Sequence, residues 1–154
     1  MHMKIMEAVP DFELPATGGQ HFKLSALRGA PLVLYFYPKD ATPGCTDEGL
    51  QFKALHEAFA ALKCTVLGIS RDSVASHERF RAKMEFPFHL LSDEQEAACT
   101  LFGVMKLKNM YGKQVRGIER STFVIDAQGI LRREWRGVSV PGHAQAVLDF
   151  VKSL

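Results

Sequence analysis

Cys45 lies at a position in the sequence that favours the ionised, nucleophilic form of a thiol. Thr42 followed by Pro43 is the pattern of a helix N-cap with proline at the first helical position. Counting on, Gly44 is the second helical residue and Cys45 the third. Free backbone N–H groups and the positive end of the helix dipole stabilise an anion there. We therefore expect Cys45 to attack electrophiles, since the thiolate is the nucleophilic form of cysteine.

The neighbours of Cys45 suit a small electrophilic substrate. Gly44 would let such a substrate approach the backbone closely, and the Thr42 hydroxyl offers it a hydrogen bond. Pro38 would shield one side of the site and, having no N–H, removes a competing donor. An unreactive cysteine at a helix start is the alternative, and this context disfavours it.

The other two cysteines are expected to be small residues of the core. Cys64 precedes an apolar segment, and Cys99 lies among apolar residues at helical spacing. No two cysteines form a C-x-x-C pair, and no two of the six histidines have the H-x-x-x-H spacing of metal ligands. We therefore expect no metal centre, and we predict that His56 and His77 are surface residues.

The elements that must position Cys45 alternate between strand and helix. Apolar runs of strand length occupy residues 32–37, 66–70 and 88–91. Helical spacing of apolar side chains occurs in residues 50–62, 74–84, 96–102 and 143–153. Ser92 and Gln95 have the pattern of a capping box ahead of the third of these helices.

The last part of the chain adds a hairpin to this order. Residues 121–125 and 130–135 are predicted strands, joined across a turn that contains Gly129. Residues 106–117 lack periodicity and are predicted to be a loop. The whole order indicates an α/β domain with a thioredoxin-like fold, in which helices cover both faces of a mixed sheet. The first strands should pair in parallel and the hairpin antiparallel.

This fold would place the Cys45 segment where ligands bind. In an open α/β sheet they bind beyond the carboxyl ends of the strands. Residues 38–48 lie there, because they connect the strand over 32–37 to the first helix.

Length and composition bound the classes of protein to which the chain can belong. Its 154 residues, 47% apolar and 23% charged, suit one globular domain over residues 1–154. The early apolar run at 32–37 is far short of the roughly 20 residues that cross a bilayer, and no secretory signal precedes it. Met3 has the position of a natural start behind two added residues, Met1 and His2. We expect a cytoplasmic protein in a reducing compartment.

Charge is distributed unevenly along the chain. The formal net charge is +2, which gives no general reason to expect binding to nucleic acid or membrane. Residues 101–136, however, hold eight Lys or Arg against three Asp or Glu. No nucleic-acid-binding motif accompanies them. We interpret this segment as a solvated face that could dock an acidic reductant.

Five segments of the chain resemble the peroxiredoxin family. Pro38-x-x-x-Thr42-x-x-Cys45 matches the peroxiredoxin active-site motif, and residues 35–46 around it resemble the bacterioferritin comigratory protein (PrxQ) branch. Further matches in order and spacing occur at residues 8–15, 66–70, 90–93 and 118–126. The resemblance therefore extends over almost the whole chain.

The resemblance implies a thiol peroxidase that reduces hydrogen peroxide and organic hydroperoxides and needs no metal, haem or flavin. Cys45 would attack one peroxide oxygen and become a sulfenic acid. Thr42 would hold the peroxide. Arg120, at the position of the family's active-site arginine, would keep Cys45 ionised and polarise the peroxide. Glu48 would pair with Arg120 and hold its guanidinium in place.

The sequence departs from its branch at the resolving cysteine. Relatives carry this cysteine at positions that correspond to Leu50 or Arg81 here. An external thiol, from thioredoxin, glutaredoxin or a small molecule, should therefore reduce the sulfenic acid of a monomeric enzyme. Three alternatives stay open: resolution by Cys64 or Cys99, thiol–disulfide exchange or hydrolysis at Cys45, and a non-enzymatic thioredoxin-like binding or chaperone module.

Overall fold

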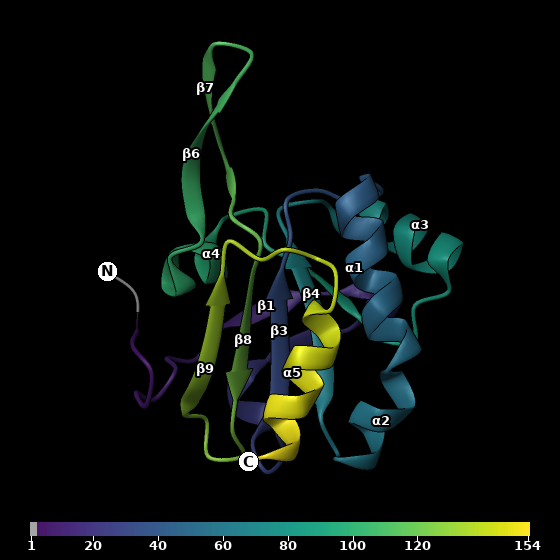
Figure 1. Cartoon of the computed structure of the whole chain (residues 1–154), viewed down its shortest axis with the longest axis vertical. Coiled ribbons are helices and arrows are strands. Elements are labelled where there is room, and N and C mark those ends of the chain that lie inside the picture. Colours follow the sequence, from purple (N-terminus) through teal and green to yellow (C-terminus); the bar gives the residue numbers. More distant parts are fainter. Residues whose placement is uncertain (1–2) are drawn as a thin grey trace.

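A five-stranded mixed sheet forms the centre of the computed structural model, which describes residues 3–154 (Figure 1). The strands are β3 (Leu32–Phe36), β4 (Thr65–Ser70), β5 (Leu90–Ser92), β8 (Ser121–Ile125) and β9 (Leu131–Arg136), in the order β5-β4-β3-β8-β9. β3, β4 and β5 pair in parallel, whereas β8 and β9 join antiparallel. This confirms the predicted mixed sheet. The expectation about Met1 and His2 lies outside the described residues.

Helices cover both faces of the sheet, as the sequence predicts. One face packs against α1 (Pro43–Ala54), α2 (His56–Ala61), α3 (Val74–Met84) and α5 (His143–Lys152). The opposite face packs against α4 (Ala97–Phe102) and the N-terminal segment, which contains the short strands β1 (Glu13–Pro15) and β2 (His21–Lys23) and the 3-10 turns η1 (Thr17–Gly19) and η2 (Leu24–Leu27). Figure 1 shows α1 and α5 side by side over the sheet. Within residues 3–154, no helix is long and apolar enough to cross a lipid bilayer.

β3 is the strand that positions Cys45. It lies between β4 and β8, and each of its five residues is buried. A strand with a paired neighbour on each side and a covered face above and below is apolar throughout, which explains the unbroken run in the sequence. The strand delivers the chain directly to the segment that starts α1.

The predicted helix over residues 50–62 is two helices instead of one. α1 ends at Ala54, and α2 begins after Leu55, whose φ of −101° and ψ of 8° interrupt the helix. The buried side of α1 consists of Cys45, Glu48, Gly49 and Phe52. Because that stripe already faces the sheet, Leu50 points elsewhere and is 39% exposed, contrary to its predicted place on the apolar stripe.

The sequence correctly predicts the residue that caps α3 but not the one that caps α4. Ser73 caps α3 as predicted, because its hydroxyl accepts from the N–H of Ser76 at 3.1 Å. The capping box ahead of α4 is wrong. Ser92 instead donates to the carbonyl of Asp72, and a carboxylate oxygen of Asp93 accepts from the N–H of Cys99. The Asp93 side chain, one residue after Ser92, therefore accepts a hydrogen bond from an open N–H group at the start of α4.

The segment predicted as a loop over residues 106–117 is a β-hairpin. β6 (Met105–Met110) and β7 (Lys113–Ile118) pair antiparallel and form a sheet of their own. In Figure 1 this hairpin, in green, projects beyond the end of the main sheet. Most of its side chains are exposed, so no buried face imposes the alternation by which a strand is recognised.

Candidate active site

α1 begins immediately beyond the carboxyl end of β3, and Cys45 is its third residue. Thr42 is the N-cap, with an extended φ of −80° and ψ of 154°, and Pro43 takes the first helical position. The Thr42 carbonyl accepts from the N–H of Thr46 at 2.9 Å. Within residues 3–154, the N–H groups of Gly44 and Cys45 have no hydrogen-bond acceptor. They are the donors that the start of a helix leaves open for an anion or a polar ligand.

The Thr42 side chain turns away from the helix that it precedes. Its hydroxyl donates to the carbonyl of Lys39 at 2.8 Å and accepts nothing from the helix N–H groups. This hydrogen bond fixes the hydroxyl rotor within the loop. The lone pairs of the Thr42 oxygen are therefore left as acceptors for a second group.

Arg120 lies against the sulfur of Cys45. Its two terminal nitrogens, Nη1 and Nη2, are 3.6 and 3.5 Å from Sγ. Arg120 follows β7 and precedes β8, so the sheet brings it across from a distant part of the chain. The Cys45 side chain is buried, with 2% of its surface exposed. A guanidinium at this distance stabilises a negative charge on the sulfur.

Glu48 holds Arg120 from one turn further along α1. Arg120 Nη1 donates to Glu48 Oε1 at 2.8 Å, and the second carboxylate oxygen of Glu48 has no partner within residues 3–154. Burial raises the pKa of Glu48 to about 7, and the charge and hydrogen bond of Arg120 oppose the rise. The predicted Glu48–Arg120 pair is thus present, but Arg120 does not fully offset the desolvation of this carboxylate.

Gly44 makes room for the arginine. A Cβ at this position would lie 3.0 Å from Nη2 of Arg120. The sequence suggests Gly44 as a route for substrate to the backbone, and the structure adds the arginine as a neighbour that needs the same space. Pro38 is half-buried and begins the loop from β3 to α1.

A buried polar network beneath this loop was not foreseen from the sequence. Asp40 accepts hydrogen bonds from the Tyr37 hydroxyl at 2.7 Å and the Ser76 hydroxyl at 2.8 Å. His77 Nδ1 lies 2.8 Å from the same carboxylate, and Nε2 donates to the carbonyl of Leu91 at 2.9 Å. The prediction that His77 lies at the surface is wrong, because the side chain is fully buried. Its spacing three residues before the apolar Phe80 is the signal that could have shown this.

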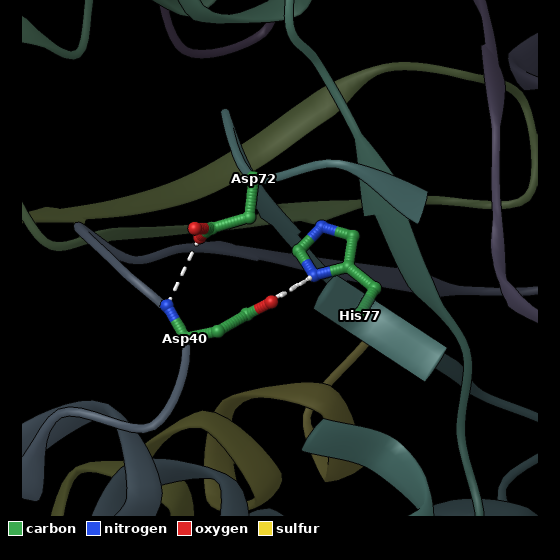
Figure 2. Close-up of side chains that lie close together, drawn as sticks. All are labelled: Asp40, Asp72 and His77. Atoms are coloured by element: carbon green, nitrogen blue, oxygen red, sulfur yellow. Dashed lines mark hydrogen bonds and ion pairs between the residues drawn. The ribbon is translucent and has the colours of Figure 1, made fainter. Parts of the chain in front are cut away.

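Asp40, Asp72 and His77 lie close together, as Figure 2 shows, but the group does not suit a metal ion. Both ring nitrogens of His77 already have hydrogen-bond partners, Asp40 for Nδ1 and the Leu91 carbonyl for Nε2, so neither is free to bind a metal. Asp72 accepts from the N–H of Asp40 at 3.0 Å. Burial acts to raise the pKa of Asp40, but the hydrogen bond and charge of His77, together with the hydrogen bonds from Tyr37 and Ser76, lower that pKa. The network fastens the Cys45 loop to α3 and β5.

Cys64 and Cys99 are buried, as predicted for core residues. Cys64 is 7% exposed, and burial raises its pKa to about 12. Cys99 is fully buried, and burial and then the Asp93 charge raise its pKa. At neutral pH both thiols keep their protons and are poor nucleophiles.

Neither thiol lies near Cys45. Cys99 packs in the core on the opposite face of the sheet. Cys64 precedes Thr65, which pairs with Leu32 at the start of β3, whereas Cys45 follows the end of that strand. Four residue steps along a strand span about 13 Å. A disulfide requires Cα atoms within about 7 Å.

Comparisons with known proteins place the chain in a family. The model of the AhpC/TSA family matches residues 5–134. The chain belongs to the AhpC/TSA family. Peroxiredoxin Bcp of Xanthomonas campestris pv. campestris is 52% identical over 151 residues, which cover 98% of this chain and 94% of that protein. Peroxiredoxin Bcp of Bacillus subtilis is 45% identical, and the match covers 100% of this chain and 98% of that protein.

Solved structures agree with the family and the fold. A cysteine-to-serine mutant of Xylella fastidiosa PrxQ superposes with a TM-score of 0.94 at 45% identity. The match covers 99% of this chain and 98% of the PrxQ chain. Xanthomonas campestris bacterioferritin comigratory protein, described with its alkyl peroxide reduction activity, has a TM-score of 0.88 at 53% identity. The match covers 92% of this chain and 90% of that protein's chain. These neighbours confirm the predicted peroxiredoxin resemblance, its PrxQ branch and the thioredoxin-like fold. This peroxiredoxin is a thiol-dependent peroxidase.

Proposed function

We propose that Cys45 is the peroxidatic cysteine and that it reduces hydrogen peroxide and organic hydroperoxides. The observation that carries this proposal is the position of the Cys45 sulfur. The guanidinium of Arg120 lies 3.5 Å from it, and Cys45 is the third residue of α1, at the end of the helix where the N–H groups are open. The positive charge and the backbone donors together stabilise a thiolate and the oxygens of a bound peroxide.

The reaction starts with attack of the Cys45 thiolate on one peroxide oxygen. A sulfur–oxygen bond forms, the oxygen–oxygen bond breaks, and the electron pair leaves with the departing oxygen. That oxygen takes a proton from solvent and departs as water or an alcohol, while Cys45 becomes a sulfenic acid. Arg120 and the backbone N–H groups stabilise the charge on the departing oxygen.

Thr42 and Pro38 shape the substrate site in this proposal. The Thr42 hydroxyl already donates to Lys39, so its oxygen can accept a hydrogen bond from the peroxide O–H. Pro38 limits access to Cys45 from the side of the loop. Gly44 leaves space for both Arg120 and the peroxide, and Glu48 positions the arginine. Organic hydroperoxides are included because the Xanthomonas campestris relative is described with alkyl peroxide reduction.

An external thiol then reduces the sulfenic acid. Leu50 and Arg81 stand at the positions where the resemblance to the family would place a resolving cysteine. Cys64 lies at the other end of the sheet and Cys99 behind it. The reductant is thioredoxin, glutaredoxin or a small thiol, and the chemistry uses no metal, haem or flavin. We also propose a monomer in the reducing cytoplasm that binds no nucleic acid; the three free cysteines agree with such a compartment.

Mass spectrometry tests this mechanism directly. The reduced protein is treated with one equivalent of hydrogen peroxide, with and without dimedone, and its intact and peptide masses are measured. We expect one dimedone adduct, on Cys45, with Cys64 and Cys99 still free. The Cys45→Ser variant should give no adduct and no turnover with dithiothreitol, while Cys64→Ser and Cys99→Ser should behave as wild type.

Two results would overturn parts of the proposal. Normal turnover in Cys45→Ser would remove Cys45 from the chemistry. A disulfide from Cys45 to Cys64 or Cys99 would establish a two-cysteine mechanism, for which α1 or the sheet edge would have to open widely.

A further inference from the structure

The β6–β7 hairpin has an unusual amount of exposed apolar surface. Of the eight large apolar residues that are exposed within residues 3–154, four belong to this hairpin: Leu107, Met110, Tyr111 and Val115. The hairpin forms a sheet of only two strands, with both edges unpaired. Two strands that stand alone in water are marginally stable. Exposed apolar side chains on such an element indicate a surface that a partner covers.

One face of the hairpin combines two of these apolar residues, Met110 and Val115, with positive charge. The register pairs Lys106 with Gly117, Lys108 with Val115, and Met110 with Lys113. Partners in an antiparallel pair share a face, and alternate residues along each strand do so too. Three lysines, with Met110 and Val115 between them, therefore lie on the same side, which we call the lysine face: Lys106, Lys108, Met110, Lys113 and Val115.

The opposite face of the hairpin already has contacts. Arg116, in register with Leu107, forms an ion pair with Glu96, which also pairs with Arg71. These bonds tie that side of the hairpin to the start of α4. On the lysine face, Lys108 Nζ donates to the Ile118 carbonyl at 2.9 Å. The exposed members of this face are left for a partner: Lys106, Met110, Lys113 and Val115.

The turn at the tip of the hairpin exposes an aromatic ring at a cost in backbone energy. Tyr111 and Gly112 have φ angles of +53° and +78°, so both central residues are left-handed, as in a type I′ turn. This turn favours Asn or Gly at the first position, and a tyrosine there is strained by about 1 kcal/mol. The tyrosine side chain is also completely exposed. Such rings are frequent energetic anchors of protein interfaces.

The hairpin is connected to the site of chemistry by two residues. β7 ends at Ile118, and Glu119 leads to Arg120, whose guanidinium lies 3.5 Å from Cys45 Sγ. Two residues of chain thus link the base of the hairpin to the arginine that contacts Cys45, the residue that must be reduced in every cycle.

From this surface we infer that the β6–β7 hairpin is a docking arm for an acidic, thiol-bearing reductant protein, held by the lysine face and Tyr111. The inference rests on the proposed peroxidase function. Residues 105–118 contain four Lys or Arg and no Asp or Glu, which selects a partner of negative charge. A second copy of this chain is a poor fit, because two lysine faces together would bring six lysines into one interface.

The docked protein would complete the cycle by thiol chemistry. A thiolate of the partner attacks the sulfur of the Cys45 sulfenic acid, a sulfur–sulfur bond forms, and the oxygen leaves as water after taking a proton. A second thiol of the partner then attacks the partner's own sulfur in that mixed disulfide. Cys45 returns as a thiolate, and the partner keeps an internal disulfide.

The test compares reductants in a variant of the arm. Lys106→Glu, Lys113→Glu and Tyr111→Asn are combined; asparagine suits the left-handed turn, so the hairpin itself is not weakened. The control is Lys63→Glu with Lys152→Glu, two exposed lysines outside the hairpin that give the same charge change. Hydrogen peroxide turnover is driven by thioredoxin and its reductase, by glutaredoxin with glutathione, by glutathione alone, or by dithiothreitol.

We expect the arm variant to raise the KM for a protein reductant by about tenfold, while its turnover with dithiothreitol matches wild type and control. Equal KM values in the arm variant and the control would overturn the docking arm. The docking arm would also be overturned if dithiothreitol or glutathione reduced the wild-type enzyme while neither thioredoxin nor glutaredoxin did. A wild type that consumes no peroxide with any reductant would instead refute the peroxidase function itself, and the arm with it.

Discussion

Glu48 should make the stability of the protein depend on pH in a way that its amide analogue does not. Its pKa of about 7 in the folded chain, against the ordinary value of 4.5, corresponds to about 3 kcal/mol. The folded chain holds this proton more tightly than the unfolded chain. The contribution to stability is therefore complete below pH 4.5 and is lost as the pH rises through about 7. Glu48→Gln keeps the shape and the hydrogen bond to Arg120 but cannot ionise.

Urea unfolding of wild type and Glu48→Gln under reducing conditions measures this contribution. Between about pH 5 and about pH 8.5, the stability of wild type relative to the variant should fall by about 2.5 kcal/mol. Any constant cost of the amide cancels in this double difference. Glu57→Gln, an exposed glutamate on α2, is the matched control and should show no such change. Parallel pH profiles for wild type and Glu48→Gln would refute the assignment of a raised pKa to this carboxylate.

Three further changes probe the arginine, the helix packing and the loop. Arg120→Met should lower the rate constant of Cys45 with hydrogen peroxide by about 100-fold in stopped-flow mixing, because the charge beside the sulfur is lost; a rate within threefold of wild type contradicts this. Gly49→Ala should lower the free energy of unfolding by about 1–3 kcal/mol, since its Cβ would lie 2.4 Å from the Phe86 ring; an unchanged urea midpoint would show that the ring moves freely. Asp40→Asn should cost about 3 kcal/mol at neutral pH by breaking the buried pair with His77. Because the Asp40 pKa is lowered, that cost should shrink as the pH falls below the ordinary value of 3.8, and an equal cost at low pH would argue against the lowered pKa of Asp40.

The apolar pattern was informative wherever an element packs into the core. β3, β8 and all of β4 except Thr65 are buried, and each of these strands contains a run of apolar residues in the sequence. The hairpin of β6 and β7 escaped prediction for the opposite reason. Neither of its faces is packed into the core, and Tyr111-Gly112 is not among the common turn pairs. The helix over residues 50–62 was predicted as continuous because apolar spacing alone does not detect the interruption at Leu55.

The start of α1 is the part of this protein that the sequence by itself determined. A proline after an N-cap residue sets the first turn locally, and counting from it places Cys45 third without any knowledge of the fold. Residues close in the chain interact through fixed backbone geometry, so such a unit can be inferred from its letters. The resemblance to peroxiredoxins could name Arg120 and its partner Glu48, but not the burial that raises the pKa of Glu48.

Only the tertiary structure decided the contacts between distant residues. Arg120 and Cys45 are 75 residues apart, and Asp40 and His77 are 37 apart, yet both pairs are within hydrogen-bonding reach. The same packing separates Cys45 from Cys64 and Cys99 and buries Glu48 deeply enough to change its acidity. Distances across a sheet and the loss of water around a charge depend on how all the elements pack together, and no local segment of sequence contains that information.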